Sequence, residues 1–290
     1  MKKFLAIALS LTLVLGLFAA CGNADNKGDN EGTPSVTDPD VTDPAGNEST
    51  ENETPDDDDA AIFTTVTPGK LTMATNAQFR PYEYYDGDKI VGIDAEIAAA
   101  IAEKLGLELV IDDMEFNSII TAVATGAADF GLAGLTVTDE RKLEVDFSTS
   151  YAKGVQSIIV KEGSAITSYD NLAAEGATYK IGVQLGTTGN IYASDEFGER
   201  VTPYNNGSEA VLALQAGDID CIIIDNEPAK AFVAANEGLV VLDSPYADED
   251  YAACFAKEND ALLDAVNQAI EELIMDGTID AIVEKYIPAN

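Results

Sequence analysis

Three segments of the sequence carry the side chains that are best suited to binding a charged small molecule. Arg141 is one of three arginines in the chain, and its planar guanidinium can hold a carboxylate through two parallel hydrogen bonds. The Gly-Thr-Thr-Gly turn at 186–189 opens a helical pattern, so its backbone N–H groups would point toward an anion. Asp225 follows the apolar run 221–224 and offers a negative charge at the end of a strand. These residue types suit an anion site together with a partner for a cation.

Each of these segments also has a structural explanation, which the residues alone leave open. Arg141 could form a surface salt bridge with an acidic neighbour such as Glu144. Gly-Thr turns are common in proteins and do not by themselves indicate a ligand. Asp225 could cap the helix that starts at Asn226-Glu227-Pro228, which has Pro in its first turn, and one residue could serve both as a cap and as a binding group.

The composition excludes several kinds of chemistry. The chain has 290 residues, of which 46% are hydrophobic, so it is large enough to bury a core. It contains no His, which removes the Ser-His-Asp triad, the Cys-His pair and nearly all ordinary zinc sites. Its formal net charge of −36 repels phosphate backbones and anionic headgroups. We therefore expect no nucleic-acid partner, no metal and no cofactor.

Residues 1–21 are typical of a secretory signal. Lys2-Lys3 precedes an apolar run over 4–20, which is shorter than the roughly 20 residues that a membrane-spanning helix needs. The ending Ala-Ala-Cys21 resembles the lipobox of bacterial lipoproteins, in which Cys21 becomes the lipidated first residue, although Phe18 stands where Leu is usual. A retained anchor or an ordinary cleaved signal is the alternative.

Residues 22–61 are predicted to form a disordered acidic linker. The segment consists mainly of Asp, Glu, Asn, Thr, Pro and Gly, so it cannot bury enough apolar surface to offset its chain entropy. We interpret it as a spacer. The four aspartates at 56–59 lack the spacing of a dedicated calcium loop.

Lys70 begins a region in which apolar runs typical of strands alternate with helical patterns. Strands are expected over 71–75, 109–111, 130–132, 157–160, 180–183 and 221–224. Helices are expected over 92–106, around 119–123 and 211–214, over 262–276 and from 279. Asp94 is expected to cap the first of these helices. This alternation predicts parallel α/β sheets in two lobes.

Four motifs in register resemble a known family. They are GIDAEIAAAIAEKLG at 92–106, AGLTVTDERKLEVDFSTSY at 133–151, GVQLGTTG at 182–189 and DNEPA at 225–229. Over residues 70–290 the chain resembles the family 3 extracellular solute-binding proteins, the polar amino-acid receptors of ABC importers. Ala95 departs from the larger aliphatic residue that the family usually has.

The resemblance implies a two-lobed α/β fold like that of type II periplasmic binding proteins, with the ligand cleft between the lobes. Lobe 1 would comprise 62–151 plus 247–290, and lobe 2 would comprise 156–241. Two crossover strands near 152–155 and 242–246 would join them. Cys221 and Cys254 would fall in different lobes, so we predict two buried thiols rather than a disulfide.

The resemblance also assigns roles to residues. Arg141 would hold the carboxylate of an amino acid with help from the backbone amides of Thr136 and Thr188, and Asp225 would pair with the ammonium group. Phe116 would cover the aliphatic part of the ligand. The predicted ligand-binding set is Asn76, Phe79, Phe116, Gly134, Thr136, Arg141, Gln184, Thr187, Thr188 and Asp225. Tyr82 is interpreted as core packing.

Side-chain specificity follows from two of these positions by the same resemblance. Members that take cationic amino acids often have Asp at the position of Asn76, whose neutral amide argues against Lys or Arg as ligand. Gln184 would add a polar contact. Glutamine is the first choice, and cystine or another small polar amino acid is next. Arg80 would permit an acidic ligand if it entered the cleft, but we expect it to face solvent.

The predicted protein is an extracytoplasmic, lipid-anchored, monomeric receptor that captures an amino acid and delivers it to an ABC permease. An enzyme like cyclohexadienyl dehydratase, which shares the fold, is one alternative. It would need a general acid, and the cleft motifs show none beyond Asp225. A ligand-sensing domain is another alternative, which would need a second membrane helix and an output domain.

Overall fold

The computed structural model describes residues 63–243 and 245–288. The predicted signal peptide, Cys21 and the predicted linker lie outside these residues. Within the described part, no helix has both the length and the apolar character needed to cross a membrane.

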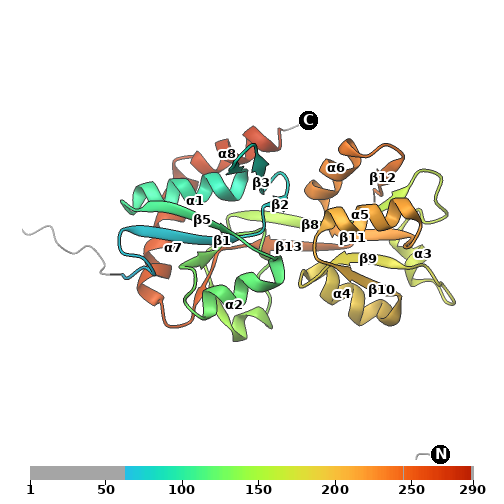
Figure 1. Cartoon of the computed structure of the whole chain (residues 1–290), viewed down its shortest axis with the longest axis horizontal. Coiled ribbons are helices and arrows are strands. Elements are labelled where there is room, and N and C mark those ends of the chain that lie inside the picture. Colours follow the sequence, from blue (N-terminus) through green and yellow to red (C-terminus); the bar gives the residue numbers. More distant parts are fainter. Residues whose placement is uncertain (1–62, 244, 289–290) are drawn as a thin grey trace, which may run out of the picture. The chain divides into compact units, whose positions relative to one another are not determined.

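Lobe 1 is built on a five-stranded mixed sheet with the order β5-β1-β6-β14-β7, of which Figure 1 labels β5 and β1. Its strands are β1 (Lys70–Thr75), β5 (Glu108–Asp113), β6 (Phe130–Gly131), β7 (Val145–Phe147) and β14 (Cys254–Ala256). Strand β1 runs parallel to β5 and β6, whereas β14 runs antiparallel to β6 and β7. The predicted parallel pairing is therefore found among β5, β1 and β6 but not for β14. That strand returns to the sheet from the far end of the chain.

Helices cover both faces of this sheet. On one face, α1 (Ile93–Lys104), α7 (Asp260–Met275) and α8 (Thr278–Tyr286) pack against one another and against Leu71 and Met73 of β1. On the other face, α2 (Ile119–Ala124) packs against Ala74. Side chains alternate between the two faces along a strand, and because both faces are covered, β1 is buried from Leu71 to Thr75. A small sheet, with the order β2-β3-β4, consists of β2 (Gln78–Phe79), β3 (Glu83–Asp86) and β4 (Lys89–Val91).

Lobe 2 contains a second mixed sheet, with the order β10-β9-β11-β8-β12 and with β13 also paired to β8. The strands are β8 (Ala152–Lys161), β9 (Ile181–Gln184), β10 (Val201–Tyr204), β11 (Cys221–Asp225), β12 (Leu239–Val241) and β13 (Ala247–Tyr251). Strands β9, β10 and β11 are parallel, and β8 is antiparallel to its three partners.

The helices of lobe 2 also lie on both faces of their sheet. They are α3 (Tyr169–Ala173), α4 (Thr188–Phe197), α5 (Gly207–Ala216) and α6 (Asn226–Ala235). Alternate residues of β11 enter two separate cores: Cys221 and Ile223 pack in one, and Ile222 and Ile224 in the other. Three short 3-10 helices complete the described part of the chain: η1 (Phe116–Ser118), η2 (Arg141–Leu143) and η3 (Gly198–Arg200).

The start of α1 differs from the prediction. Gly92, and not Asp94, is the N-cap, with a φ of 131°. A Cβ atom at Gly92 would lie 2.2 Å from the carbonyl oxygen of Tyr82, so the close approach of the chain at this point requires glycine. Asp94 lies within the helix, fully buried. Its Oδ2 accepts hydrogen bonds from the Gly134 N–H and from the Tyr151 hydroxyl, each at 2.8 Å.

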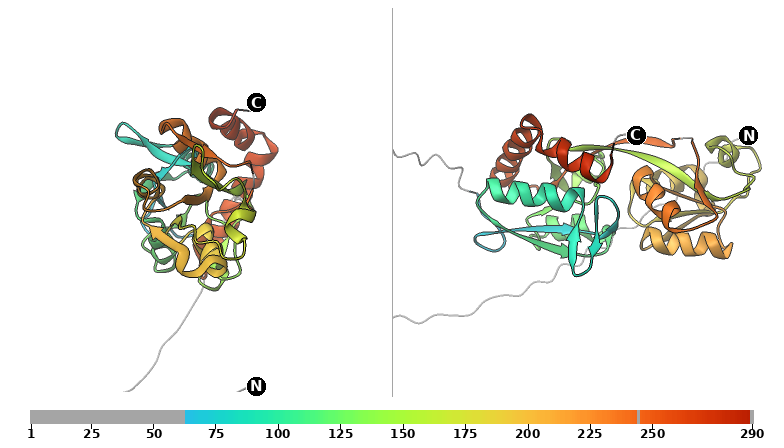
Figure 2. Two further views of the ribbon diagram at one scale, coloured as in Figure 1. Left: turned by 90° about the vertical axis from the view of Figure 1, so that its right-hand side faces the viewer. Right: turned by 90° about the horizontal axis from the view of Figure 1, so that it is seen from above.

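The lobes are connected by the long strand β8 and its partner β13, which form an antiparallel ribbon (Figure 2, right). The register runs from Ala247 opposite Gln156 to Tyr251 opposite Ala152. The second crossover was expected over 242–246. The N–H groups of Leu242 and Tyr246 instead bond to β8 carbonyls at 158 and 156, so the connection is made a few residues later, by β13.

The two cysteines of the described chain are buried and unbonded, which confirms that prediction. Cys221 lies in the sheet of lobe 2 and Cys254 in the sheet of lobe 1. Burial raises the pKa of each thiol to about 12.

Candidate functional site

One cavity is lined by residues of both lobes. The lining residues are Phe79, Phe116, Gly134, Thr136, Arg141, Gln156, Gln184, Thr187, Thr188, Ile224, Asp225, Glu249 and Tyr251. This set contains every residue of the predicted ligand-binding set except Asn76. The structure therefore brings together side chains that are more than 140 positions apart in the sequence, from Phe79 to Asp225.

Arg141 lies in η2, and only 5% of its surface is exposed. Its Nη1 donates to the Thr136 carbonyl at 2.7 Å, and its Nη2 donates to the Gly186 carbonyl of lobe 2 at 3.0 Å. Among the described residues no carboxylate lies within 4.0 Å of it, so the surface salt bridge was the wrong alternative. Burial lowers the pKa of this guanidinium, and Glu249 opposes the shift. A buried guanidinium that faces a cavity suits an anionic ligand group.

The N-terminus of α4 reaches the same cavity. Thr187 is its N-cap: the hydroxyl accepts from the Asn190 N–H at 3.2 Å and donates to the Gln184 carbonyl at 2.8 Å. The Thr188 hydroxyl lies 3.4 Å from that of Thr136 in lobe 1. Because the first N–H groups of a helix have no intrahelical partner, this end of α4 adds anion-binding capacity beside Arg141.

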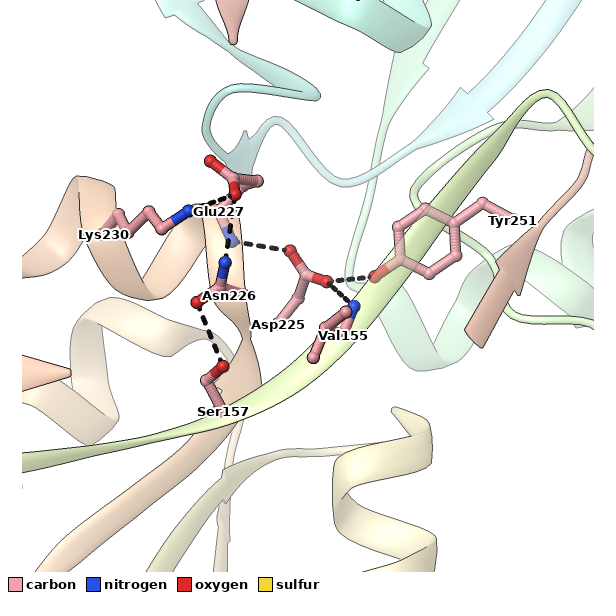
Figure 3. Close-up of polar contacts among 7 residues, drawn as sticks. All are labelled: Val155, Ser157, Asp225, Asn226, Glu227, Lys230 and Tyr251. Atoms are coloured by element: carbon pink, nitrogen blue, oxygen red, sulfur yellow. Dashed lines mark hydrogen bonds and ion pairs between the residues drawn. The ribbon is translucent and has the colours of Figure 1, made fainter. Parts of the chain in front are cut away.

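Asp225 ends β11 and is 1% exposed. One carboxylate oxygen, Oδ1, caps α6 by accepting from the Glu227 N–H at 3.0 Å. The other, Oδ2, accepts from the Val155 N–H at 3.2 Å and from the Tyr251 hydroxyl at 2.7 Å (Figure 3). Burial raises the pKa of Asp225 to about 7, although these three hydrogen bonds favour the ionised form. Asp225 is thus a helix cap whose carboxylate also lines the cavity.

The ribbon of β8 and β13 supplies the part of the cavity wall that joins the lobes. Opposite residues of an antiparallel pair share one face, so Gln156, Gly154, Glu249 and Tyr251 lie on the cavity side. A Cβ atom at Gly154 would lie 2.3 Å from the Tyr251 hydroxyl oxygen. The missing side chain at Gly154 therefore lets the Tyr251 ring cross the ribbon and reach Asp225.

Two aromatic rings supply apolar surface. Phe79 and Phe116 line the cavity, and the Phe116 ring centroid lies 5.6 Å from the Arg141 guanidinium carbon. Tyr82 is buried in the core of lobe 1, stacks on Phe79 at 5.8 Å and meets Tyr251 edge to face at 5.5 Å. It does not line the cavity, in agreement with its interpretation as core packing.

Asn76 contacts the site through Gln184. Its Oδ1 accepts from Gln184 Nε2 at 3.2 Å, and its Nδ2 donates to the Met114 carbonyl at 2.8 Å. Asn76 is buried but is not part of the cavity wall, whereas Gln184 is. Arg80 is exposed, lies over the Tyr84 ring at 3.7 Å and is outside this cavity, as expected.

Four lining residues were missed by the sequence analysis: Gln156, Ile224, Glu249 and Tyr251. The cleft motifs contain no acid beyond Asp225, but Glu249, which lies outside these motifs, is a second acid on the cavity wall. The signal that could have found it is the spacing of Glu249 and Tyr251 by two in Asp-Glu-Asp-Tyr, which puts both side chains on one face of a strand. No periodic apolar pattern marks that strand.

Two α/β lobes, joined by a pair of strands and lining one cavity together, define a solute-binding protein with a type II periplasmic-binding-protein fold. The model of the bacterial extracellular solute-binding proteins, family 3, matches residues 71–289. The chain belongs to this family. The matching family and the curated relatives are solute-binding proteins and not enzymes, so the comparisons do not support the dehydratase alternative.

Relatives with assigned ligands support this classification. The arginine-binding extracellular protein ArtP of Bacillus subtilis (strain 168) is 35% identical over 223 residues, which cover 75% of this chain and 86% of ArtP. The ABC transporter glutamine-binding protein GlnH of the same organism is 30% identical over 99% of this chain and 98% of its own. An ancestral arginine-binding protein bound to glutamine is similar in structure, with a TM-score of 0.72 and 37% identity over 77% of this chain and 100% of its own.

Proposed function

We propose that the chain binds a free polar α-amino acid in this cavity, with Arg141 on the ligand carboxylate and Asp225 on its ammonium group. The observation that carries the proposal is that these two buried, oppositely charged side chains come from different lobes and line one cavity. An α-amino acid in its zwitterionic form carries the complementary pair of charges. The relatives ArtP and GlnH are named for amino acids.

A neutral polar side chain, as in glutamine, is the first candidate. The support is the amide pair of Asn76 and Gln184, which is uncharged and reaches the cavity through Gln184. Hydrogen bonding to amide groups suits a ligand amide. GlnH and the ancestral protein bound to glutamine have neutral ligands of this kind.

A cationic side chain, as in arginine, is the second candidate. Its support is Glu249, a buried carboxylate on the cavity wall that is separate from the amide pair of Asn76 and Gln184. The relative ArtP is named as an arginine-binding protein.

Ligand capture would be coupled to closure of the lobes around the cavity. Contacts between the lobes already include Arg141 with Gly186 and Asn76 with Gln184, and a ligand held by both lobes would add to them. We propose that the closed, monomeric receptor delivers its ligand to an ABC permease. The division into lobes at 62–151 plus 247–290 and 156–241, the signal peptide and the lipid anchor on Cys21 are parts of the same proposal.

A thermal-shift screen of the full chain against the twenty amino acids and cystine tests the proposal. A ligand that binds only the folded state at about 100 times its Kd adds about 2.7 kcal/mol of stability. For a protein of this size that corresponds to a rise in Tm of roughly 5–10 °C. We expect such a rise with at least one polar amino acid. A folded chain whose Tm responds to none of them would contradict the proposed function.

A further inference from the structure

Glu249 is a second carboxylate in the cavity, on the ribbon that joins the lobes. It lies on β13 opposite Gly154 of β8 and is 6% exposed. It faces the cavity together with Gln156 and Tyr251. Its neighbours along the strand, Asp248 and Asp250, are exposed, as the alternation of a strand requires. Glu249 is therefore the acid of this Asp-Glu-Asp run that a ligand in the cavity can meet.

Half of the Glu249 carboxylate lacks a partner among the described residues. Oε2 accepts from Gln156 Nε2 at 2.9 Å. Oε1 is buried and accepts no hydrogen bond, and Oε1 of Gln156 is also buried without a donor. Within the described ranges no Lys or Arg forms a salt bridge with Glu249. A buried carboxylate oxygen without a hydrogen-bond donor is costly. A ligand donor that binds this oxygen would therefore gain more binding free energy than the same donor would gain at the surface.

The charges on the cavity wall do not balance. When both acids are ionised, Arg141 contributes one positive charge, whereas Asp225 and Glu249 contribute two negative charges. A zwitterionic ligand adds no net charge and leaves one carboxylate uncompensated. An amino acid with a cationic side chain neutralises the set, because its carboxylate, ammonium and side-chain cation match Arg141, Asp225 and Glu249 one to one.

We propose that Glu249 is a specificity-determining residue that makes the site prefer an amino acid with a cationic side chain over a neutral amino acid of the same shape. The inference rests on the proposed function and chooses between its two candidates. The donors of a guanidinium or an ammonium group fill the acceptor that Gln156 leaves unmet, and a charge-assisted hydrogen bond is about twice as strong as a neutral one.

The ligand pair L-arginine and L-citrulline isolates this effect, because the ureido group of citrulline has nearly the shape of a guanidinium without its charge. Calorimetry at pH 8 on the full chain should give a Kd for arginine at least about tenfold lower than for citrulline. In Glu249→Gln, which keeps the shape and the contact with Gln156, this ratio should fall to about twofold or less. Asp248→Asn removes the same charge from the exposed face of the same strand and should leave the ratio unchanged.

Two results would overturn the inference. The first is wild-type protein that binds citrulline as tightly as arginine. The second is Glu249→Gln that weakens both ligands equally, which would mean that Glu249 only supports Arg141 electrostatically. If Glu249→Gln does not fold, Glu249→Asp replaces it and must retain a preference for arginine, since the charge is kept. Failure of the proposed function is distinguishable, because the folded wild-type chain would then bind neither ligand nor any amino acid of the thermal-shift screen.

Discussion

The hydroxyl of Tyr251, on the ribbon that joins the lobes, donates a 2.7 Å hydrogen bond to Oδ2 of Asp225 in lobe 2 (Figure 3). Tyr251 also packs against Tyr82 in the core of lobe 1. The carboxylate that we assign to the ligand ammonium group is thereby oriented by a side chain anchored in the other lobe. The position of the Asp225 carboxylate therefore depends both on the ribbon and on its role as the cap of α6.

Removal of this hydrogen bond should weaken ligand binding moderately. In Tyr251→Phe the ring packing is kept, but the ionised carboxylate of Asp225 loses one hydrogen-bond donor. A hydrogen bond to a charged acceptor is worth roughly 1.5–3 kcal/mol, and the loss is smaller if a water molecule replaces the hydroxyl. Calorimetry with the best ligand of the screen should show about a tenfold loss of affinity. Tyr246→Phe, whose hydroxyl donates to Glu196 outside the cavity at 3.1 Å, is the matched control. Unchanged affinity in Tyr251→Phe would show that Asp225 does not need this donor.

Binding should strengthen as the pH rises through 7. Burial raises the pKa of Asp225 to about 7 in the ligand-free protein, so the carboxyl group is protonated at lower pH, and a ligand ammonium group favours the ionised form. Below pH 7 the ligand must therefore displace a proton, and affinity should fall by up to about tenfold per pH unit. Above pH 7 it should level off.

Calorimetry between pH 5 and 8 in two buffers of different ionisation enthalpy measures both the affinity and the proton released. Asp225→Asn should bind weakly and without this pH dependence, whereas the exposed Asp248→Asn should behave as wild type. Proton release that persists in Asp225→Asn would assign the titration to another group.

Glu83 should hold a proton at neutral pH. It is fully buried next to Asp94, and both of its carboxyl oxygens and Asp94 Oδ1 would lack donors if both groups were ionised. A proton on one Glu83 oxygen, donated to Asp94 Oδ1, satisfies two of these three atoms. Burial, followed by the charge of Asp94, raises the pKa of Glu83 well above its usual value. Asp94 in turn holds the Gly134 N–H and the Tyr151 hydroxyl, so this pair supports one loop of the site.

The sign of the pH effect follows from the raised pKa. The folded state keeps the Glu83 proton while the unfolded chain releases it above about pH 4.5, so this group stabilises the fold less as pH rises. From pH 7 to 8 the free energy of unfolding in urea should fall less steeply with pH in Glu83→Gln than in wild type. The exposed Glu258→Gln is the control. Equal slopes in Glu83→Gln and wild type would contradict the shared proton.

The sequence predicted the parts of the structure that local pattern determines. The four-residue spacing of Ile93, Ile97 and Ile101 places them on the buried side of α1. The run at 221–224 is apolar throughout because β11 has a core on each face. Nine of the ten predicted binding residues line the cavity, and seven of these nine belong to the motifs at 133–151, 182–189 and 225–229, which are recognisable without the fold.

Features that depend on pairing between distant segments were not predictable in this way. Glu249 looks like part of an exposed acidic run, and only its pairing with Gly154 turns it toward the cavity. Asp94 has the sequence position of a helix cap, but its carboxylate is used by Gly134, 40 residues away. The antiparallel strand β14 comes from the end of the chain. In each of these three cases, contacts between segments far apart in the sequence determine the structure, whereas the local sequence pattern indicates something else.

Substitution of Arg141 tests the central claim, that one buried guanidinium holds the carboxylate of an amino acid. Calorimetry on Arg141→Ala, with the ligand identified by the screen, should show a loss of roughly 2–5 kcal/mol of binding free energy, because a desolvated carboxylate would lose its charge-assisted pair. Arg141→Lys should recover part of the loss, and Arg80→Ala, outside the cavity, should bind as wild type. Wild-type affinity in a folded Arg141→Ala would contradict the account.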